Sequence, residues 1–289
     1  MAKAFLKRAN NCDSSFYVDN TCIDCGTCYW VAPETFKKDG PQSAVFCDPS
    51  TMEQIDLAHV AKYCCPTNSI GHIGKHSCPP PFPRNLEDNV YHLGFHDRKS
   101  FGATSYLIKC SNGNILIDSP RFVRKLANRI HNDGGIKYQL LTHEDDVADS
   151  HLYKKEFNTT LYFPSGDKAP PRLDIDQTLD SDKSEIQITP ELLAISVPGH
   201  TKGHFCFLYK EKFLFTGDHL CFSRHLRHLY AFINHCWHSK ELLLDSVKKL
   251  RNYQFSYVLP GHGSPHNFDS SKSAKESLNR GIAWMESNM

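Results

Sequence analysis

The sequence predicts an α/β layered domain preceded by a small cysteine-rich domain. In the larger part of the 289-residue chain, apolar strand-like runs alternate with helical stretches, an order typical of a sheet covered by helices. A proline-rich segment at 74–85, GKHSCPPPFPRN, separates this region from a cysteine cluster. We therefore expect one domain over residues 1–73, a linker over 74–86 and a second domain over 87–289.

The small domain is predicted to contain short strands and one helix. FYVD (16–19), SAVF (43–46) and SIGHI (69–73) have the composition of strands, whereas residues 52–64 carry apolar side chains near helical spacing. A domain of this size buries little apolar surface, so we expect a metal centre to stabilise it.

The large domain is predicted to alternate strands with helices. Strands are expected at VYHLGF (90–95), TSYLIKC (104–110), NILIDS (114–119), KYQLL (137–141), TLYFP (160–164), EIQIT (185–189), LLAISV (192–197), HFCFLY (204–209), KFLFTG (212–217) and YVL (257–259). Helices are expected at 121–132, 147–157, 239–252 and 269–286, and an amphipathic helical hairpin at 221–239. Several His and Asp residues follow strands directly, where loops can bring them to one site.

The charge balance argues against nucleic acid or an anionic membrane as a partner. Lys and Arg number 33, Asp and Glu number 32, and the net charge is +1. No run of apolar residues is long enough for a membrane helix, and mean hydropathy is −0.47. The N-terminus lacks a secretory signal pattern, which favours the cytoplasm; its basic residues keep a mitochondrion or plastid as an alternative.

Twelve Cys and 17 His indicate metal binding in a reducing compartment. Cys22, Cys25 and Cys28 form C-x-x-C-x-x-C, and Cys65 precedes a proline, which is the bacterial-type iron–sulfur spacing. Cys64 is the less favoured fourth ligand, and a zinc knuckle or buried thiols are the alternatives. FYVDNTCIDCGTCYWVAPETF and CPTNSI resemble the single-cluster ferredoxins. The resemblance implies one 4Fe-4S cluster that transfers one electron or stabilises the small domain.

Five motifs in the large domain occur in an order and spacing that resemble the metallo-β-lactamase superfamily: ILIDS, THEDDVADSH, PGHTKGH, FTGDHL and LPGHG. The resemblance covers residues 90–270 and implies an αββα sandwich with a metal site at one edge. His143, His200 and His262 each follow a strand and are the expected metal ligands. A catalytic metal takes only some of its ligands from protein, because one position stays open for water. Asp218 matches the aspartate that bridges two metals in the family.

The first motif departs from the family pattern H-x-H-x-D-H. Asp145 replaces the second histidine, and two extra residues are needed to align Asp149 with the family's aspartate. Ser150 then stands where a histidine belongs, and His151 is one position late, either a ligand or a surface residue. Carboxylates favour iron or manganese relative to zinc. The expected metal ligands are His143, Asp145, Asp149, His151, His200, Asp218 and His262.

We expect one or two ions, of zinc or iron with manganese as a further candidate, and hydrolysis of an ester, thioester or lactone-like bond in a small-molecule substrate. Asp145 or Asp149 would orient the attacking water or bind metal. Asp118 would position the first-motif loop, and His204 would orient a ligand.

Two alternatives stay open. A carboxylate at the position of Asp145 is also found in flavodiiron proteins, which suggests an iron-dependent oxidoreductase fed by the cluster and by a redox partner; their flavodoxin-like domain is absent here. A non-catalytic subunit with an eroded metal site is the third hypothesis.

Overall fold

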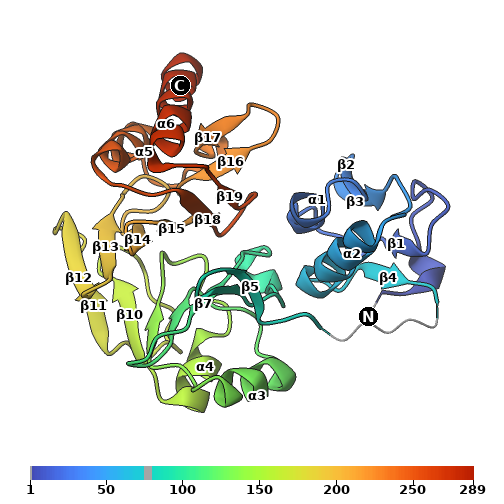
Figure 1. The fold of residues 1–289 in the computed structure, drawn as a ribbon, viewed down its shortest axis with the longest axis horizontal. Helices are drawn as coiled ribbons and strands as arrows, with labels where there is room; N and C mark the ends of the chain where they lie inside the picture. The colour runs from blue at the N-terminus through green and yellow to red at the C-terminus, as the bar shows by residue number, and fades with distance from the viewer. Residues whose placement is uncertain (1, 75–79) are drawn as a thin grey trace.

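The computed structural model describes residues 2–74 and 80–289, which form a small lobe beside a large layered one (Figure 1). The elements of the small lobe are η1 (Ala4–Leu6), β1 (Phe16–Val18), α1 (Thr27–Val31), β2 (Phe36–Asp39), β3 (Gln42–Val45), α2 (Met52–Cys64) and β4 (Ile70–His72). β1 pairs with β4 and β2 with β3, both antiparallel. α2 begins and ends where the sequence predicts. Its start is fixed by a capping box that Thr51 and Gln54 form.

A seven-stranded sheet forms one layer of the large lobe, in the order β11-β10-β9-β8-β7-β6-β5. Its strands are β5 (Arg84–Glu87), β6 (Val90–His92), β7 (Tyr106–Ile108), β8 (Ile115–Ile117), β9 (Tyr138–Leu140), β10 (Thr160–Pro164) and β11 (Gln177–Leu179). A short 3-10 turn, η2 (Arg98–Ser100), lies between β6 and β7. β8, β9 and β10 are parallel, so their connections cross over through α3 (Arg124–Asn132) and α4 (Ser150–Phe157).

A six-stranded sheet forms the second layer, in the order β12-β13-β14-β15-β18-β19. Its strands are β12 (Glu185–Thr189), β13 (Leu192–Ser196), β14 (Phe205–Tyr209), β15 (Phe213–Gly217), β18 (Tyr257–Pro260) and β19 (His266–Asn267). β15 and β18 are parallel, and the crossover between them includes α5 (Lys240–Lys249) and η4 (Leu250–Asn252). The C-terminal helix is α6 (Ser271–Asn288).

The alternation of side chains along the strands builds an αββα sandwich. Tyr106, Ile108, Phe205 and Phe207 point into one buried layer between the two sheets. Their sequence neighbours point outward. Leu107 packs with α3 and α4 on one side, and the outward residues of β14 and β15 pack with α5 and α6 on the other (Figure 1). The predicted fold class is confirmed.

Residues 221–239 differ from the predicted helical hairpin. β16 (Cys221–Ser223) pairs antiparallel with β17 (His228–Tyr230), and η3 (Ile233–His235) follows. Leu229, Ala231 and Ile233 are buried at every second position, which is the period of an extended chain. The prediction of a helix was wrong because it gave weight to composition rather than to this alternation.

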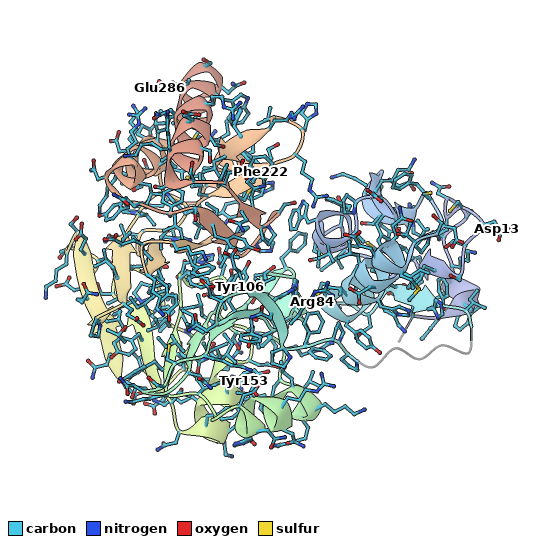
Figure 2. The ribbon with its side chains drawn as sticks, viewed as in Figure 1. Asp13, Arg84, Tyr106, Tyr153, Phe222 and Glu286 are labelled. Carbon is cyan, nitrogen blue, oxygen red and sulfur yellow. The ribbon has the colours of Figure 1, made fainter. Side chains whose placement is uncertain are left out.

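The two lobes pack against each other through apolar and charged contacts. Val60 and Cys64 of α2 share one buried cluster with Phe82 and Leu93 of the large lobe. Arg84, which Figure 2 labels at the junction, forms an ion pair with Asp56 at 2.7 Å.

The predicted linker at 74–86 is only partly described. Residues 75–79 lie outside the described residues, whereas 84–86 belong to β5. The division into domains at 1–73 and 87–289 stays a prediction. No helix within 2–74 or 80–289 is long and apolar enough to cross a membrane.

Candidate metal centre

Four strand ends bring the candidate ligands to one edge of the sandwich. His143 follows β9, His200 follows β13, Asp218 follows β15 and His262 follows β18. β13 and β15 are both antiparallel to β14, and β18 is parallel to β15, so the C-terminal ends of three strands meet at the same edge. The topology therefore makes a shared site out of residues that are far apart in the sequence.

The candidate ligand atoms lie within a few ångströms of one another. Nε2 of His143 and Nε2 of His200 each lie 3.7 Å from Oδ2 of Asp218. The same two nitrogens lie 3.8 Å and 3.4 Å from Oδ2 of Asp145. Nδ1 of His262 contacts the other oxygen of Asp218 at 2.7 Å. Asp218 therefore stands between the two groups of ligands.

Several side-chain atoms at this edge of the sandwich have no hydrogen-bond partner among the described residues. They are the Nε2 atoms of His143, His200 and His262 and both carboxylate oxygens of Asp146. A buried polar atom without a partner is costly, so atoms left without partners in one place fit a site that holds metal. The donor set of imidazoles and carboxylates suits zinc, iron or manganese.

Asp146 is a candidate site residue that the sequence analysis missed. It is buried, and one of its oxygens lies with ligand atoms of His143 and Asp218 in a group compact enough to bind one ion. Burial and the charge of Asp218 raise the pKa of Asp146 well above its usual range. Its place directly after Asp145 was the available signal, but the family spacing directed attention to Asp149.

Asp149 and His151 lie apart from the ligand groups. The Asp149 carboxylate forms an ion pair with Nζ of Lys99 at 2.6 Å and accepts a hydrogen bond from the Phe122 N–H at 2.8 Å. Burial opposes these contacts, but together they lower the pKa of Asp149. His151 is in the first turn of α4, where burial and the charge of Arg172 lower its pKa. The structure does not bring these two residues to the centre.

Asp118 and His204 contact the ligand-bearing loops directly. Asp118 accepts a hydrogen bond from the Thr142 N–H at 2.8 Å, and burial raises its pKa to about 7. The Asp218 N–H donates to Nε2 of His204 at 3.2 Å, and the His204 ring stacks on the ring of His143 at 4.6 Å. The first contact is with Thr142, the residue before His143, and the second set involves the backbone of Asp218 and the ring of His143.

Burial and neighbouring charges shift the pKa values of the imidazoles and carboxylates of the candidate centre. Burial lowers the pKa of His143 to about 4, which keeps its ring neutral and able to bind metal. Burial alone would raise the pKa of Asp218, but the charge of His262 and its hydrogen bond hold that pKa below the usual range. The same pair raises the pKa of His262 against the effect of burial.

The four predicted cluster cysteines converge in the small lobe. Cys22 and Cys25 lie in the loop before α1, Cys28 lies in α1, and Cys65 follows α2. Backbone N–H groups of Ser43 and Ser69 donate to the sulfurs of Cys22 and Cys65 at 3.4 Å and 3.2 Å. Burial, with the charges of the neighbouring thiols, raises the pKa of Cys25 to about 11. Sulfurs grouped in this way fit an iron–sulfur cluster, whose irons bind thiolates.

Known proteins resemble the two parts of the chain separately. Residues 18–72 match the family of the 4Fe-4S single cluster domain of Ferredoxin I. The lactamase-like protein aptB of Emericella nidulans is 27% identical over 174 residues, which is 56% of this chain and 52% of that protein. A hydroxyacylglutathione hydrolase of Bartonella tribocorum is 37% identical over 79 residues, 27% of this chain and 31% of that protein. The chain thus spans about half, or less, of the length of these relatives.

Solved structures resemble the large lobe in fold. A metallo-β-lactamase from Pseudomonas aeruginosa, solved in a mono-zinc form, superposes with a TM-score of 0.55 at 15% identity over 71% of this chain and 94% of that one. A metallo-β-lactamase from Hirschia baltica gives 0.53 at 14% identity over 70% and 95%. The large lobe therefore has the metallo-β-lactamase fold. The chain is a metallo-β-lactamase-fold protein that carries an N-terminal single-cluster 4Fe-4S ferredoxin domain.

Proposed function

We propose that the chain is a metal-dependent hydrolase that cleaves an ester, thioester or lactone-like bond. The observation that carries the proposal is the convergence of the Nε2 atoms of His143 and His200, which have no hydrogen-bond partner, with the carboxylates of Asp145, Asp146 and Asp218. The Bartonella tribocorum relative, named as a hydrolase of a hydroxyacylglutathione, supports a thioester as the member of this class to test first.

The contacts suggest which residues hold the metal. His143, Asp145 and His200 form one compact group of ligand atoms, and Asp146 and Asp218 form a second group that shares His143. We assign the first group to one ion, and Asp146, Asp218 and His262 to a second. In this assignment Asp218 would serve both ligand sets, because its Oδ2 lies near Nε2 of His143 and its Oδ1 contacts Nδ1 of His262.

A bound divalent metal lowers the pKa of water to about 7 and polarises the bond to be cleaved. The residues of this chain determine where that chemistry happens. Asp145 is the exposed member of the ligand set, with 45% of its side chain accessible, so it is the carboxylate that can also orient water or substrate. We assign Asp149 to holding Lys99 and the start of α4 rather than to the reacting groups.

Two exposed aromatic side chains flank the proposed ligands. The Trp237 ring lies 6.0 Å from that of His200, and the Phe101 ring lies 6.2 Å from that of His262. Both are more than half exposed, which is unusual for large apolar residues. A substrate with an apolar portion next to the cleaved bond would contact both rings.

The test is turnover of a panel of thioesters, esters and lactones by anaerobically purified, metal-loaded protein. We expect activity that falls by about 100-fold or more in His200→Ala and in Asp146→Asn, because each change removes a metal ligand. His131→Ala is the matched control, since His131 is an exposed histidine on α3 whose contacts, with Glu156 and Phe157, involve no proposed ligand. Background turnover by the fully loaded wild type would refute the proposal.

One observation favours the oxidoreductase as a second candidate. The Trp30 ring, two residues from the cluster ligand Cys28, lies 6.2 Å from the ring of His262. In this alternative the reduced cluster gives one electron at a time to an oxidant such as oxygen at the metal centre, and an external redox partner reduces the cluster again. Stopped-flow reoxidation of the reduced cluster by oxygen that is equally fast in wild type and His200→Ala would contradict it.

A further inference from the structure

A third group of potential metal-binding side chains, made of residues that neither the cluster nor the metal centre uses, lies between the two lobes. Cys64 is the last residue of α2, His92 is the last residue of β6, and His96 follows in the next loop. All three are buried, and their sulfur and ring nitrogens lie within 4.8 Å of one another. The apolar side chains of Phe82, Leu93 and Phe95 pack in the same buried cluster as Cys64, and the charge of Arg84 acts on both Cys64 and His92.

The cluster does not account for Cys64. Cys65 packs with Cys28 in the core of the small lobe, whereas Cys64 packs with residues of the large lobe. Sγ of Cys64 lies 3.9 Å from Nε2 of His92, so its nearest polar neighbour is an imidazole.

The distances are close to those of a tetrahedral zinc site. Nε2 of His92 lies 2.9 Å from Nε2 of His96. Zinc–sulfur and zinc–nitrogen bonds of about 2.3 and 2.05 Å at the tetrahedral angle separate sulfur from nitrogen by about 3.6 Å and the two nitrogens by about 3.3 Å. Each observed separation is therefore within a few tenths of an ångström of the value that a shared ion requires.

The hydrogen bonds of His96 leave its Nε2 unprotonated, with Nε2 of His92 as its neighbour at 2.9 Å. Its Nδ1 lies 2.7 Å from the carbonyl oxygen of Gly102, and a carbonyl can only accept, so the proton is on Nδ1. Metal-binding histidines commonly donate their second N–H to a carbonyl in this way.

We propose that Cys64, His92 and His96 bind one divalent transition-metal ion of the zinc class. A thiolate with two imidazoles is a donor set that selects zinc over magnesium or calcium. The small lobe supplies the sulfur and the large lobe supplies both nitrogens, so the ion crosslinks the two lobes. The site also adjoins the cluster, because Thr27 lies 3.4 Å from Nδ1 of His96 and accepts from Sγ of Cys25 at 3.4 Å.

The experiment is zinc-edge X-ray absorption on the full chain, purified anaerobically and loaded with zinc. The iron of the cluster does not contribute at this edge, and the proposed ligands of the metal centre are nitrogen and oxygen only. We expect zinc–sulfur scattering at about 2.3 Å in the wild type. In Cys64→Ser this signal should disappear and zinc should fall by one equivalent, with iron and acid-labile sulfide unchanged.

Two further variants keep the test decisive. Cys206→Ser removes another fully buried thiol, in the large-lobe core, and should retain the zinc–sulfur signal. His96→Gln leaves the thiol in place and should also lose one zinc, which covers the case in which Cys64→Ser does not fold. Absence of zinc–sulfur scattering in the wild type overturns the proposal, and so does its persistence in Cys64→Ser with a full complement of iron. In that case Cys64, His92 and His96 are a hydrogen-bonded group and not a metal site.

Discussion

Gly261 offers a way to disturb the metal centre without removing a ligand. A Cβ at this position would lie 2.8 Å from Oδ2 of Asp146 and 2.9 Å from Oδ1 of Asp218. Both separations are about half an ångström shorter than ordinary contact. The backbone cannot easily yield, because the Gly261 N–H donates to Gly217 at 2.7 Å and its carbonyl accepts from Thr104 at 2.8 Å.

The carboxylates must therefore move in Gly261→Ala. Metal sites tolerate changes in ligand distance of about 0.2 Å, so a shift of half an ångström exceeds that tolerance. We expect zinc affinity to fall by about 10- to 100-fold, the range seen when groups that orient ligands are lost. This corresponds to about 1.4 to 2.8 kcal/mol.

The assay is competition for zinc between the protein and a chromophoric chelator, with circular dichroism to verify that each variant is folded. Gly281→Ala is the control: its Cβ would lie 1.9 Å from the Leu229 carbonyl oxygen, and none of its contacts is a proposed ligand. It should destabilise the fold and leave zinc affinity unchanged. If folded Gly261→Ala binds zinc as tightly as the wild type, the assignment of Asp146 and Asp218 as ligands is wrong.

Three further predictions concern the core, an ion pair and the cluster. Phe207→Ala should lower the free energy of unfolding by about 3–5 kcal/mol in urea titration, because Phe207 is fully buried between the sheets. The pKa of Asp149 is lowered in the folded state, so its ion pair with Lys99 stabilises the fold above about pH 4 and less as pH falls through the folded pKa. Asp149→Asn should therefore be less stable than wild type at pH 7, with a difference that shrinks in acid; a constant difference would contradict this origin. Cys65→Ser should lose the four irons, whereas Cys64→Ser should keep them, as measured by iron and acid-labile sulfide; the reverse result would exchange their roles.

The sequence was most informative where the local pattern of a segment, such as a helix cap or an apolar run, agrees with its burial in the fold. The limits of α2 follow from its cap and its apolar spacing, and most strands of the sandwich follow from runs such as FCFLY and FLFTG. These runs are buried on both faces because sheet and helix cover them, so their apolar character is continuous. Elements of this kind depend little on distant residues.

The sequence was least informative where the chain turns. The helix expected from Val147 begins instead at Ser150, because Ala148 has a left-handed backbone with φ of 42°. This places Asp149 at the helix start, paired with Lys99, and leaves Asp146 facing the centre. The left-handed Ala148 turns the chain between Asp146 and Asp149, so the spacing of the family motif did not locate the carboxylate that faces the candidate centre.

One loop of the large lobe, at Phe101 and Gly102, contacts both a predicted cluster cysteine and the candidate metal centre. A Cβ on Gly102 would lie 3.1 Å from Sγ of Cys25, and the adjacent Phe101 ring lies 6.2 Å from that of His262. The loop that packs on the predicted cluster ligand Cys25 therefore also contacts the candidate metal centre, and a protein without its cluster could lose the proposed hydrolysis for steric reasons alone. Changing the redox state of an intact cluster leaves this packing in place. If the hydrolytic rate is the same with the cluster oxidised and reduced but falls in Cys65→Ser, the cluster is a structural support. If the rate changes with the redox state, the cluster takes part in the chemistry or in its control.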